Sequence, residues 1–480
     1  MAKDNKKLEV EKLKTEIERL KKELKKRKKY GLVWEEKPEE LVEMCKEKLP
    51  VLKEVKNKEI ITDKDKPVNL LIEGDNYHAL SVLNYTHAKK VDVIYIDPPY
   101  NTGQKDFKYN DQWVDIEDTY RHSKWLAFME KRLVLAKNLL KNNGVIFIQI
   151  DDNEIAQLKL LCDEIFGPNN FRNMLVWAYR TGGSPSKKDV FGRKHDYILF
   201  YSRSDNYFFN VLKEKIYYQK DFFGAKKDEK GNFYAEVNLR DVVEGEIELF
   251  KGGKFYKKIN VKPVLNLSSE RVMDFPSQKP IGLIKFLLEV TTNKDSIICD
   301  FFAGTGSTGE AVLDLNRDDN GNRKFILCTN NENNIATDIC YPRIKKAIFG
   351  FKNRPALGGN LKYFKTDFVD YDEPTDKNKI KLTKQATEML CVREGTFEKV
   401  LDDEKFKVFK NSGHYTGIIW DQSVIPAFKE AIKDIKGKFS VYVFSLGDET
   451  FDDEFKDAKQ KVQLSPIPEA ILRVYRRIFK

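Results

Sequence analysis

An acid, two prolines and an aromatic residue follow one strongly apolar run of this chain, as Asp97, Pro98, Pro99 and Tyr100. The run Val91–Ile96 is rich in valine and isoleucine, a composition typical of a strand buried in a parallel sheet. Such a strand presents Asp97 and Tyr100 at its carboxyl edge, where open α/β sheets bind ligands. Because proline fixes φ and has no N–H, the turn should be stiff and its carbonyl groups should stay free. A carboxylate, a free carbonyl and a flat aromatic face suit a planar ring with an exocyclic amine.

A second stretch, residues 296–309, combines a strand, a glycine-rich turn and the start of a helix. The apolar residues before Asp300 predict the strand, and the helix is predicted to continue over Glu310–Leu315. Glycines in such a turn let a ligand approach the backbone closely, and the helix N-terminus faces that ligand. The sequence therefore predicts a ligand site at this second strand end.

The glycines at 304, 306 and 309 also fit G-x-G-x-x-G, the pattern of dinucleotide-binding turns. A dinucleotide enzyme should carry an acid at the end of the next strand, to hold a ribose. That strand is predicted over Lys324–Cys328, where Thr329 follows and the first acid, Glu332, comes late. NAD binding is therefore only a remote alternative.

Composition sets broad limits on the chain. A length of 480 residues allows two or three domains, and a net charge of +10 fits a nucleic-acid partner without proving one. The six cysteines are scattered without metal-ligand spacing, so we expect reduced thiols and no metal site. We find neither a signal peptide nor an apolar run long enough to span a membrane, so a cytoplasmic protein is expected.

Alternating strands and helices predict an α/β fold with a largely parallel sheet. Further strands are expected at Val68–Ile72 and Val145–Ile150, and helices at 121–141 and Tyr341–Phe349. The predicted domains are an N-terminal helix or coiled coil (1–29), two parts of one core (30–168 and 267–350), a β-rich insertion (169–266) and a small C-terminal α+β domain (351–480). A helix is also expected around Leu41–Lys48, and the last one over Glu469–Lys480.

The insertion interleaves lysines and arginines with aromatic residues, between glycine-rich turns such as Thr181–Lys188. This composition favours a surface that binds phosphates and stacks on bases, although any basic β-rich insertion would share it. At the N-terminus, the apolar spacing predicts a short coiled coil through Val10, Leu13, Ile17, Leu20 and Leu24. This helix could join a dimer or a partner subunit, or pack on its own domain.

The order of the two motifs resembles the β group of S-adenosylmethionine-dependent DNA amino-methyltransferases, and most closely the modification subunits of type III restriction systems. The resemblance covers about residues 68–349. It implies a Rossmann-like methyltransferase sheet, double-stranded DNA as substrate, S-adenosyl-L-methionine as cofactor, a target-recognition role for the insertion, and a separate helicase–nuclease partner. The catalytic residues that it implies are Asp97, Pro98, Pro99 and Tyr100.

The resemblance also implies a set of cofactor-binding residues. These are Asp75, Gln278, Lys279, Pro280, Asp300, Phe302, Ala303, Gly304, Thr305, Gly306 and Asn331. Asp75 could equally be a helix N-cap. Many relatives place an acid where this chain has Thr329, so either Asn331 or Glu332 would hold the ribose. His195–Tyr201 resembles the strand behind the active site.

The chemistry that the resemblance implies is methylation of adenine N6 in a base flipped out of the duplex. An acid at position 97, rather than serine, favours adenine over cytosine N4. Alternatives are a cytosine-N4 or RNA methyltransferase, a fused restriction–methylation enzyme with a C-terminal nuclease, and an inactive DNA-binding scaffold. No nuclease constellation or helicase phosphate loop is evident in the C-terminal third, and intact Asp97 and Tyr100 argue against a scaffold.

Overall fold

A sheet of ten strands dominates the computed structural model, which describes residues 34–179, 191–264, 278–351, 354–371, 375–447, 449 and 451–479. The chain divides into two units, 1–36 and 37–480, and the description below concerns the second. The coiled coil predicted over residues 1–29 and the turn predicted at 181–188 lie outside the described residues. No described helix is both long enough and apolar enough to cross a bilayer.

The large sheet is mostly parallel, as predicted. Its strands in spatial order are β1 (Lys48–Glu54), β17 (Asn360–Asp370), β2 (Val68–Glu73), β16 (Lys324–Thr329), β15 (Ile297–Asp300), β3 (Val91–Ile96), β6 (Leu140–Ile150), β8 (His195–Ser202), β7 (Phe171–Ala178) and β12 (Val242–Glu244). Neighbouring strands from β17 to β6 run parallel, whereas β1, β8 and β7 are antiparallel to a neighbour. The central strands are buried because they carry continuous apolar runs. The predicted α/β fold is therefore confirmed.

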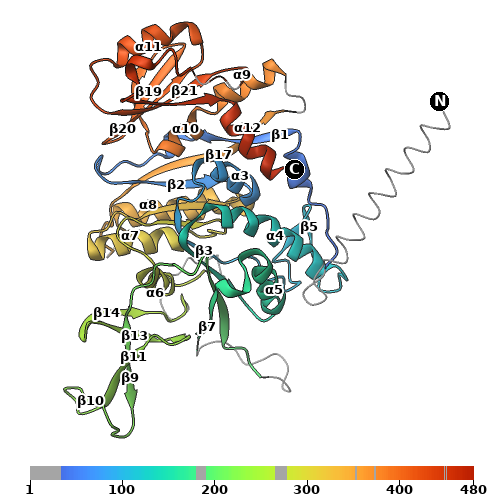
Figure 1. Cartoon of the computed structure of the whole chain (residues 1–480). Coiled ribbons are helices and arrows are strands. Elements are labelled where there is room, and N and C mark those ends of the chain that lie inside the picture. The colour runs from blue at the N-terminus through green and yellow to red at the C-terminus, as the bar shows by residue number, and fades with distance from the viewer. Residues whose placement is uncertain are drawn as a thin grey trace, which may run out of the picture. The chain divides into compact units, whose positions relative to one another are not determined.

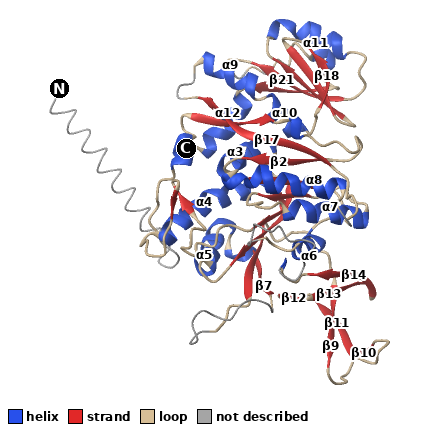
Figure 2. Ribbon diagram, turned by 180° about the vertical axis from the view of Figure 1, so that it is seen from behind, coloured by secondary structure: helices blue, strands red, loops and turns tan. Residues whose placement is uncertain are grey.

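Helices connect these strands in two groups (Figures 1 and 2). In one, α3 (Asn76–Thr86) packs on α4 (Arg121–Leu139), and α4 packs on α5 (Ile155–Phe166). In the other, α7 (Ser307–Asp319) packs between α6 (Ile281–Thr291) and α8 (Tyr341–Phe349). A small hairpin, β4 (Lys108–Tyr109) with β5 (Gln112–Trp113), precedes α4. Parallel strands joined by crossover helices bring all their carboxyl ends to one edge of the sheet.

Two boundaries differ from the sequence prediction. The helix expected to run to residue 141 ends at Leu139, and β6 begins at Leu140 without a loop. A Cβ on Gly144 would lie only 3.0 Å from the Val91 carbonyl oxygen, so this glycine allows β6 to pass close to β3. The helix expected at 41–48 is the short α2 (Glu40–Met44), and the chain then enters β1, which was not predicted.

The β-rich insertion is smaller than the predicted range 169–266. Strands β7 and β8 belong to the large sheet, and a separate sheet contains β10 (Lys226–Lys227), β11 (Phe233–Asn238), β9 (Lys213–Tyr218), β13 (Glu246–Lys251) and β14 (Lys254–Asn260). Figure 1 shows this sheet at the bottom of the view, below α6. The composition of the insertion did not reveal that β8 pairs with β6 and that β7 pairs with β8 in the large sheet.

Both ends of this separate sheet are fastened to α6. Before β9, the Asn210 backbone N–H donates to the Val290 carbonyl at 2.7 Å, and its side chain donates to the Glu289 carbonyl at 2.7 Å. At the end of β14, the Asn260 carbonyl lies so close to Gly282 that a Cβ on this glycine would be 1.8 Å from the oxygen. One helix of the core therefore anchors the insertion at its entry and at its exit.

The C-terminal part contains a third sheet. It consists of β18 (Glu398–Asp402), β19 (Phe406–Lys410), β20 (His414–Ile419), β21 (Lys438–Phe444) and β22 (Val462–Ile467), with helices α9 (Asp376–Gln385), α10 (Thr387–Glu394), α11 (Ile425–Ile432) and α12 (Glu469–Ile478). Apolar side chains of the strands and of α11 form a core of their own. The preceding β17 belongs to the large sheet, so the predicted boundary at 351 falls before a core strand. All six cysteines of the chain are buried and free, as expected.

Candidate active site

Strands β3 and β15 bring the two sequence motifs to the same edge of the sheet. They are parallel neighbours, with Ile94 opposite Cys299. Asp97 follows the last residue of β3, and Asp300 is the last residue of β15. The predicted Asp97–Tyr100 turn and the predicted glycine-rich turn therefore lie side by side, although about 200 residues separate them in sequence.

Lys279 connects the first turn to the segment before α6. Its Nζ lies 2.8 Å from Asp97 Oδ2 and 5.0 Å from the centroid of the Tyr100 ring. The sequence assigned Lys279 to the cofactor and Asp97 to catalysis, whereas the structure joins the two in one ion pair. Pro280 is the N-cap residue of α6, and both Pro280 and Gln278 are buried.

Asp97 has two internal partners. The Tyr100 hydroxyl donates to Asp97 Oδ1 at 2.9 Å, and the Lys279 ammonium pairs with Oδ2. Burial nevertheless raises the pKa of Asp97 above its usual value, because the favourable effects of Lys279 and Tyr100 offset the loss of water only in part. Asp97 is therefore an unusually basic carboxylate with spare lone pairs.

Asp196 of β8 is a member of this cluster that the sequence did not single out. The Tyr100 hydroxyl also lies 3.3 Å from Asp196 Oδ2, so its one proton is shared between two carboxylates, and Gln149 Nε2 donates to Asp196 Oδ2 at 3.1 Å. Gln149 in turn accepts a 2.8 Å hydrogen bond from the buried Tyr95 hydroxyl. Since Tyr95 and Gln149 lie on β3 and β6, this network fixes the Tyr100 hydroxyl from three strands of the sheet.

The prediction that the proline carbonyls stay free is wrong for Pro99. The Trp125 indole Nε1 on α4 donates to the Pro99 carbonyl at 2.8 Å. Trp125 is completely buried, so its N–H needs such an acceptor. The Pro98 carbonyl is then the proline acceptor that remains for a ligand.

A second buried cluster holds the chain just after Tyr100. Asn101 has a positive φ of 56°, and its Nδ2 donates to Glu154 Oε1 at 2.5 Å. His122 Nδ1 lies 2.6 Å from the same oxygen. Glu154 is fully buried, and its Oε2 has no hydrogen-bond partner among the described residues. Burial raises the pKa of Glu154. Asn101, which is held at a positive φ, is therefore hydrogen-bonded to a buried carboxyl group that lacks a partner for its second oxygen among the described residues.

The glycine-rich turn is organised around Asp300. Its carboxylate accepts from the Phe302 backbone N–H at 3.0 Å and from the Thr308 hydroxyl at 2.6 Å. Burial raises the pKa of Asp300 to about 7. These bonds span the turn that contains Ala303, Gly304, Thr305 and Gly306, and they show that Asp300 shapes the turn from inside.

Arg343 of α8 supports the other side of that turn, a role that the sequence did not reveal. Its Nη1 donates to the hydroxyls of Thr305 and Ser307, both at 3.0 Å, and its Nε pairs with Glu310 at 2.6 Å. A Cβ on Gly306, whose φ is 82°, would lie 3.0 Å from Cys340 Sγ. The turn is therefore packed firmly against the helix behind it.

Asp75 has the helix-capping contact that the sequence offered as its alternative role. Its Oδ1 accepts from the Tyr77 backbone N–H at 2.7 Å, and Arg132 lies 3.4 Å from its Oδ2. The neighbouring Asn76 donates to the Phe301 carbonyl at 3.1 Å, which links this strand end to the glycine-rich turn. Asp75 is one-quarter exposed, so a cofactor role stays a prediction.

The predicted ribose residue Asn331 also has a local structural role. Its Oδ1 accepts from the backbone N–H groups of Ala336 and Thr337, both at 3.1 Å. Glu332, the other candidate, pairs with Lys108 of β4 at 3.2 Å. The structure leaves both assignments as predictions.

The site as a whole offers a partly exposed tyrosine ring, a carboxylate and the Pro98 carbonyl at one strand end. Beside them lies a turn that allows close backbone approach. The part of the chain that forms this arrangement matches a known protein family. Residues 91–340 match the DNA methylase family.

This chain belongs to the DNA methylase family. Among curated relatives, it is 31% identical over 342 residues to the Mod subunit of the type III restriction-modification enzyme StyLTI of Salmonella typhimurium, covering 54% of this chain and 52% of that protein. It is 30% identical to the EcoPI Mod subunit of Escherichia phage P1, with coverage of 58% and 60%. The type II methyltransferase M.KpnI of Klebsiella pneumoniae is 30% identical, with coverage of 62% and 88%. The chain thus spans about half to three-fifths of the two Mod subunits.

Proposed function

We propose that this member of the DNA methylase family transfers a methyl group from S-adenosyl-L-methionine to N6 of adenine in double-stranded DNA. The observation that carries the proposal is the Asp97–Tyr100 turn at the end of β3, next to the glycine-rich turn at the end of β15. The names of the relatives, type III Mod subunits and a type II methyltransferase, support methyl transfer as the reaction class.

The residues at these strand ends fit the cofactor. Gly304 and Gly306 have positive φ angles, so the turn exposes backbone where a side chain would otherwise stand. The Phe302 side chain next to them is partly exposed, although Phe301 and Ala303 are buried. In this proposal Phe302, Gly304 and Gly306 line the cofactor site, and Gln278–Pro280 hold its methionine end. When bound, the cofactor supplies an already activated methyl group, so the protein contributes positioning and electrostatics.

The target base must leave the duplex to reach this site, at an unstacking cost of a few kcal/mol. The partly exposed Tyr100 ring can stack on the flipped base and recover part of that cost. Asp97 Oδ1 can accept a further hydrogen bond besides the one from the Tyr100 hydroxyl. The Pro98 carbonyl can also accept, and the next residue, Pro99, has no N–H. Each can accept one hydrogen from the exocyclic amine. Together they localise the lone pair of the nitrogen and direct it toward the methyl donor.

Adenine is favoured over cytosine because the first motif position is an acid, as in the adenine-modifying relatives that the motif resembles. The alternatives are methylation of cytosine N4 or of RNA. Methyl transfer from labelled S-adenosylmethionine to unmethylated genomic DNA, followed by mass spectrometry of the nucleosides, separates them. We expect N6-methyladenine with the wild type and none with Asp97→Ala. Methylated cytosine would overturn the choice of base, and methylation confined to RNA would overturn the choice of substrate.

The proposal extends to partners. Type III relatives are named as subunits, so we propose a separately encoded restriction subunit for this chain. The apolar stripe of residues 10–24 further favours a homodimer. Light scattering of the full chain and of a form without residues 1–29 tests the dimer, and a monomer in both cases at micromolar concentration would contradict it.

A further inference from the structure

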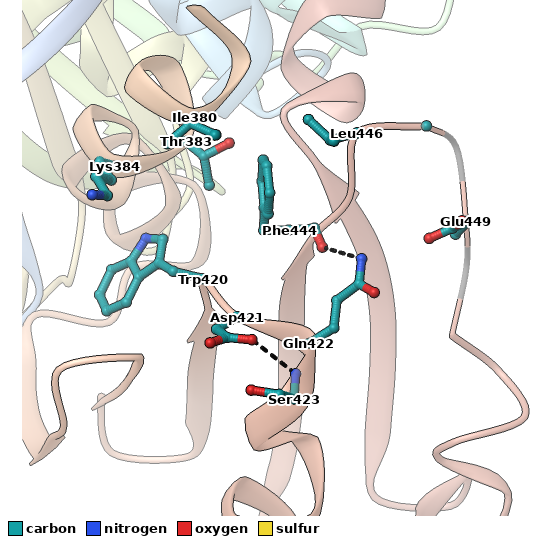
Figure 3. A pocket seen from close by; sticks show the side chains of 11 residues that line it. Ile380, Thr383, Lys384, Trp420, Asp421, Gln422, Ser423, Phe444, Leu446 and Glu449 are labelled. Carbon is teal, nitrogen blue, oxygen red and sulfur yellow. Dashed lines mark hydrogen bonds between the residues drawn. The ribbon is translucent and has the colours of Figure 1, made fainter. Parts of the chain in front are cut away.

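A cavity of about 660 Å³ lies in the C-terminal part, at the carboxyl edge of its own sheet. Strands β20, β21 and β22 are parallel there, and α11 makes the crossover from β20 to β21. The carboxyl edge of parallel strands is where α/β sheets bind ligands. Helix α9 covers this edge (Figure 3). The cavity thus has the same relation to its sheet as the candidate active site has to the large sheet.

Two aromatic side chains form its walls. Ile419 pairs with Val443, so the next residues, Trp420 and Phe444, leave neighbouring strands at the same level. Figure 3 shows their rings on either side of the hollow, with Thr383 and Lys384 of α9 above them. The indole and phenyl planes are differently inclined in Figure 3, so the hollow between them suits an aromatic ligand that stacks on one ring and touches the other.

The hydrogen-bonding groups of this cavity determine which ligand atoms it can bind. The indole Nε1 of Trp420 is buried and has no acceptor among the described residues, which is costly for an N–H donor. Asp421, directly after it, accepts from the Ser423 backbone N–H at 2.9 Å and pairs with Lys405 at 2.8 Å. These contacts lower the pKa of Asp421 to about 2, so it is a carboxylate at neutral pH. The site therefore lacks an acceptor for an N–H and offers an acceptor for hydroxyls.

We propose that this cavity binds a nucleoside, with its base between Trp420 and Phe444, a ring nitrogen accepting from Trp420 Nε1, and its ribose hydroxyls donating to Asp421. An acid just past a parallel strand is a common partner of ribose hydroxyls in α/β proteins. The charged residues that line the cavity are Asp421, Glu449 and Lys384, so the net negative charge of its lining favours the nucleoside over a phosphate group. This inference does not rest on the proposed methyltransferase activity, because none of these residues belongs to the candidate active site.

The test is equilibrium dialysis of the full chain against radiolabelled adenosine, and the binding that variants of Trp420 and Ile380 remove belongs to the cavity, because neither residue lies in the candidate active site. We expect Trp420→Ala to weaken adenosine binding at least about tenfold, since stacking on one aromatic ring is worth about 1–3 kcal/mol. Trp420→Phe keeps the stack but loses the N–H, and should have an intermediate effect. Trp113→Phe, at an exposed tryptophan outside the C-terminal part, is the matched control and should bind normally.

A second variant distinguishes loss of ligand binding from loss of folding. Ile380 is 42% exposed on α9 and lines the cavity, so Ile380→Trp should fill it without removing core contacts. We expect this variant to unfold at the wild-type temperature and to lose adenosine binding. Weaker binding of 2′-deoxyadenosine than of adenosine would support the Asp421 contact.

The source of the nucleoside is settled in the same experiment. A short single-stranded RNA that binds with the same variant pattern, while adenosine does not, would assign the site to a nucleoside within a polymer. Adenosine binding that is unaffected by Trp420→Ala and Ile380→Trp would overturn the proposal. So would the absence of both adenosine and RNA binding at millimolar concentration.

Discussion

Lys279 Nζ lies 2.8 Å from Asp97 Oδ2, and this ion pair joins the segment before α6 to the turn after β3. The pair couples the part of the site proposed to hold the cofactor to the part proposed to hold the base. It also opposes the burial that raises the pKa of Asp97.

Replacing Lys279 should therefore change the pH dependence of methylation. Asp97 accepts hydrogen bonds as a carboxylate, so activity falls as the pH drops through its pKa. Without the cation this pKa rises further, and in Lys279→Met we expect the acid limb of kcat/KM to move up by about one pH unit. Lys279→Arg keeps the charge and serves as the control. An acid limb at the same pH in both variants would contradict the coupling.

Asp97→Asn should separate catalysis from cofactor binding. The amide keeps the size of the side chain but loses the charge and half of the acceptor capacity, so we expect single-turnover methylation to fall by at least about a hundredfold. Cofactor affinity, measured by calorimetry, should change less than about threefold, because Asp97 is proposed to contact the base. Equal losses of methylation and cofactor affinity would assign Asp97 to the cofactor instead.

Tyr100 can be divided into its ring and its hydroxyl. The ring is proposed to stack on the base, whereas the hydroxyl is bound to Asp97 and Asp196. We expect Tyr100→Ala to weaken DNA binding and methylation by roughly tenfold or more, in line with about 1–3 kcal/mol for one stacked base. Tyr100→Phe should retain most of the DNA binding. If the two variants lose DNA affinity equally, the hydroxyl rather than the ring contacts DNA.

Glu154 should act by holding Asn101 in its left-handed conformation. In Glu154→Gln one oxygen can still accept from Asn101, so we expect nearly normal stability and a reduction of kcat below about tenfold. Glu154→Ala leaves the buried Asn101 amide with only the Arg121 carbonyl at 3.4 Å as acceptor, and should cost about 1–3 kcal/mol of unfolding free energy. It should also lower kcat more than it raises KM for the cofactor. Thermal unfolding and steady-state kinetics measure both effects, and identical kcat values in the two variants would contradict this role.

Asp300 gives a prediction about stability and pH. Its pKa is about 7 in the folded protein, above the usual value of 3.8, so the folded state binds the proton more tightly. The contribution of this group to stability is therefore present at low pH and is lost as the pH rises toward 8.

Asp300→Asn mimics the protonated form and removes this dependence. Between pH 5 and pH 8, we expect the unfolding free energy of the wild type to fall by roughly 2–3 kcal/mol relative to the variant. Urea unfolding of both proteins at the two pH values measures the difference. A difference that is constant with pH would show that Asp300 does not titrate in this range.

The sequence predicted the parts of the site that local patterns encode. Val91–Ile96 and Lys324–Cys328 are apolar runs long enough to require burial, and the motif residues at their ends follow from strand geometry. The Tyr341–Phe349 helix was predicted with the bounds that the structure shows. In each case one short segment contains the whole signal.

Contacts between distant segments could not be predicted in this way. Asp196 reaches Tyr100 only because β8 pairs with β6, and Trp125 reaches Pro99 only because α4 packs under the turn. His195–Tyr201 resembles the strand behind the active site, but nothing local showed that this strand pairs with β6 or that Asp196 contacts Tyr100. The role of Arg343 could not be predicted either, because the sequence around one arginine in a basic helix does not indicate which distant residues it contacts.

The attachment of the inserted sheet to α6 has a consequence for how such proteins can diversify. The sheet leaves the core near Asn210 and returns near Asn260, and both points are held by a single helix. A different inserted sheet can therefore replace this one during evolution, provided that the two attachments to α6 are kept. Lineages that inherit the same strand ends around Asp97 and Asp300 can then acquire new inserted surfaces without rebuilding the chemistry.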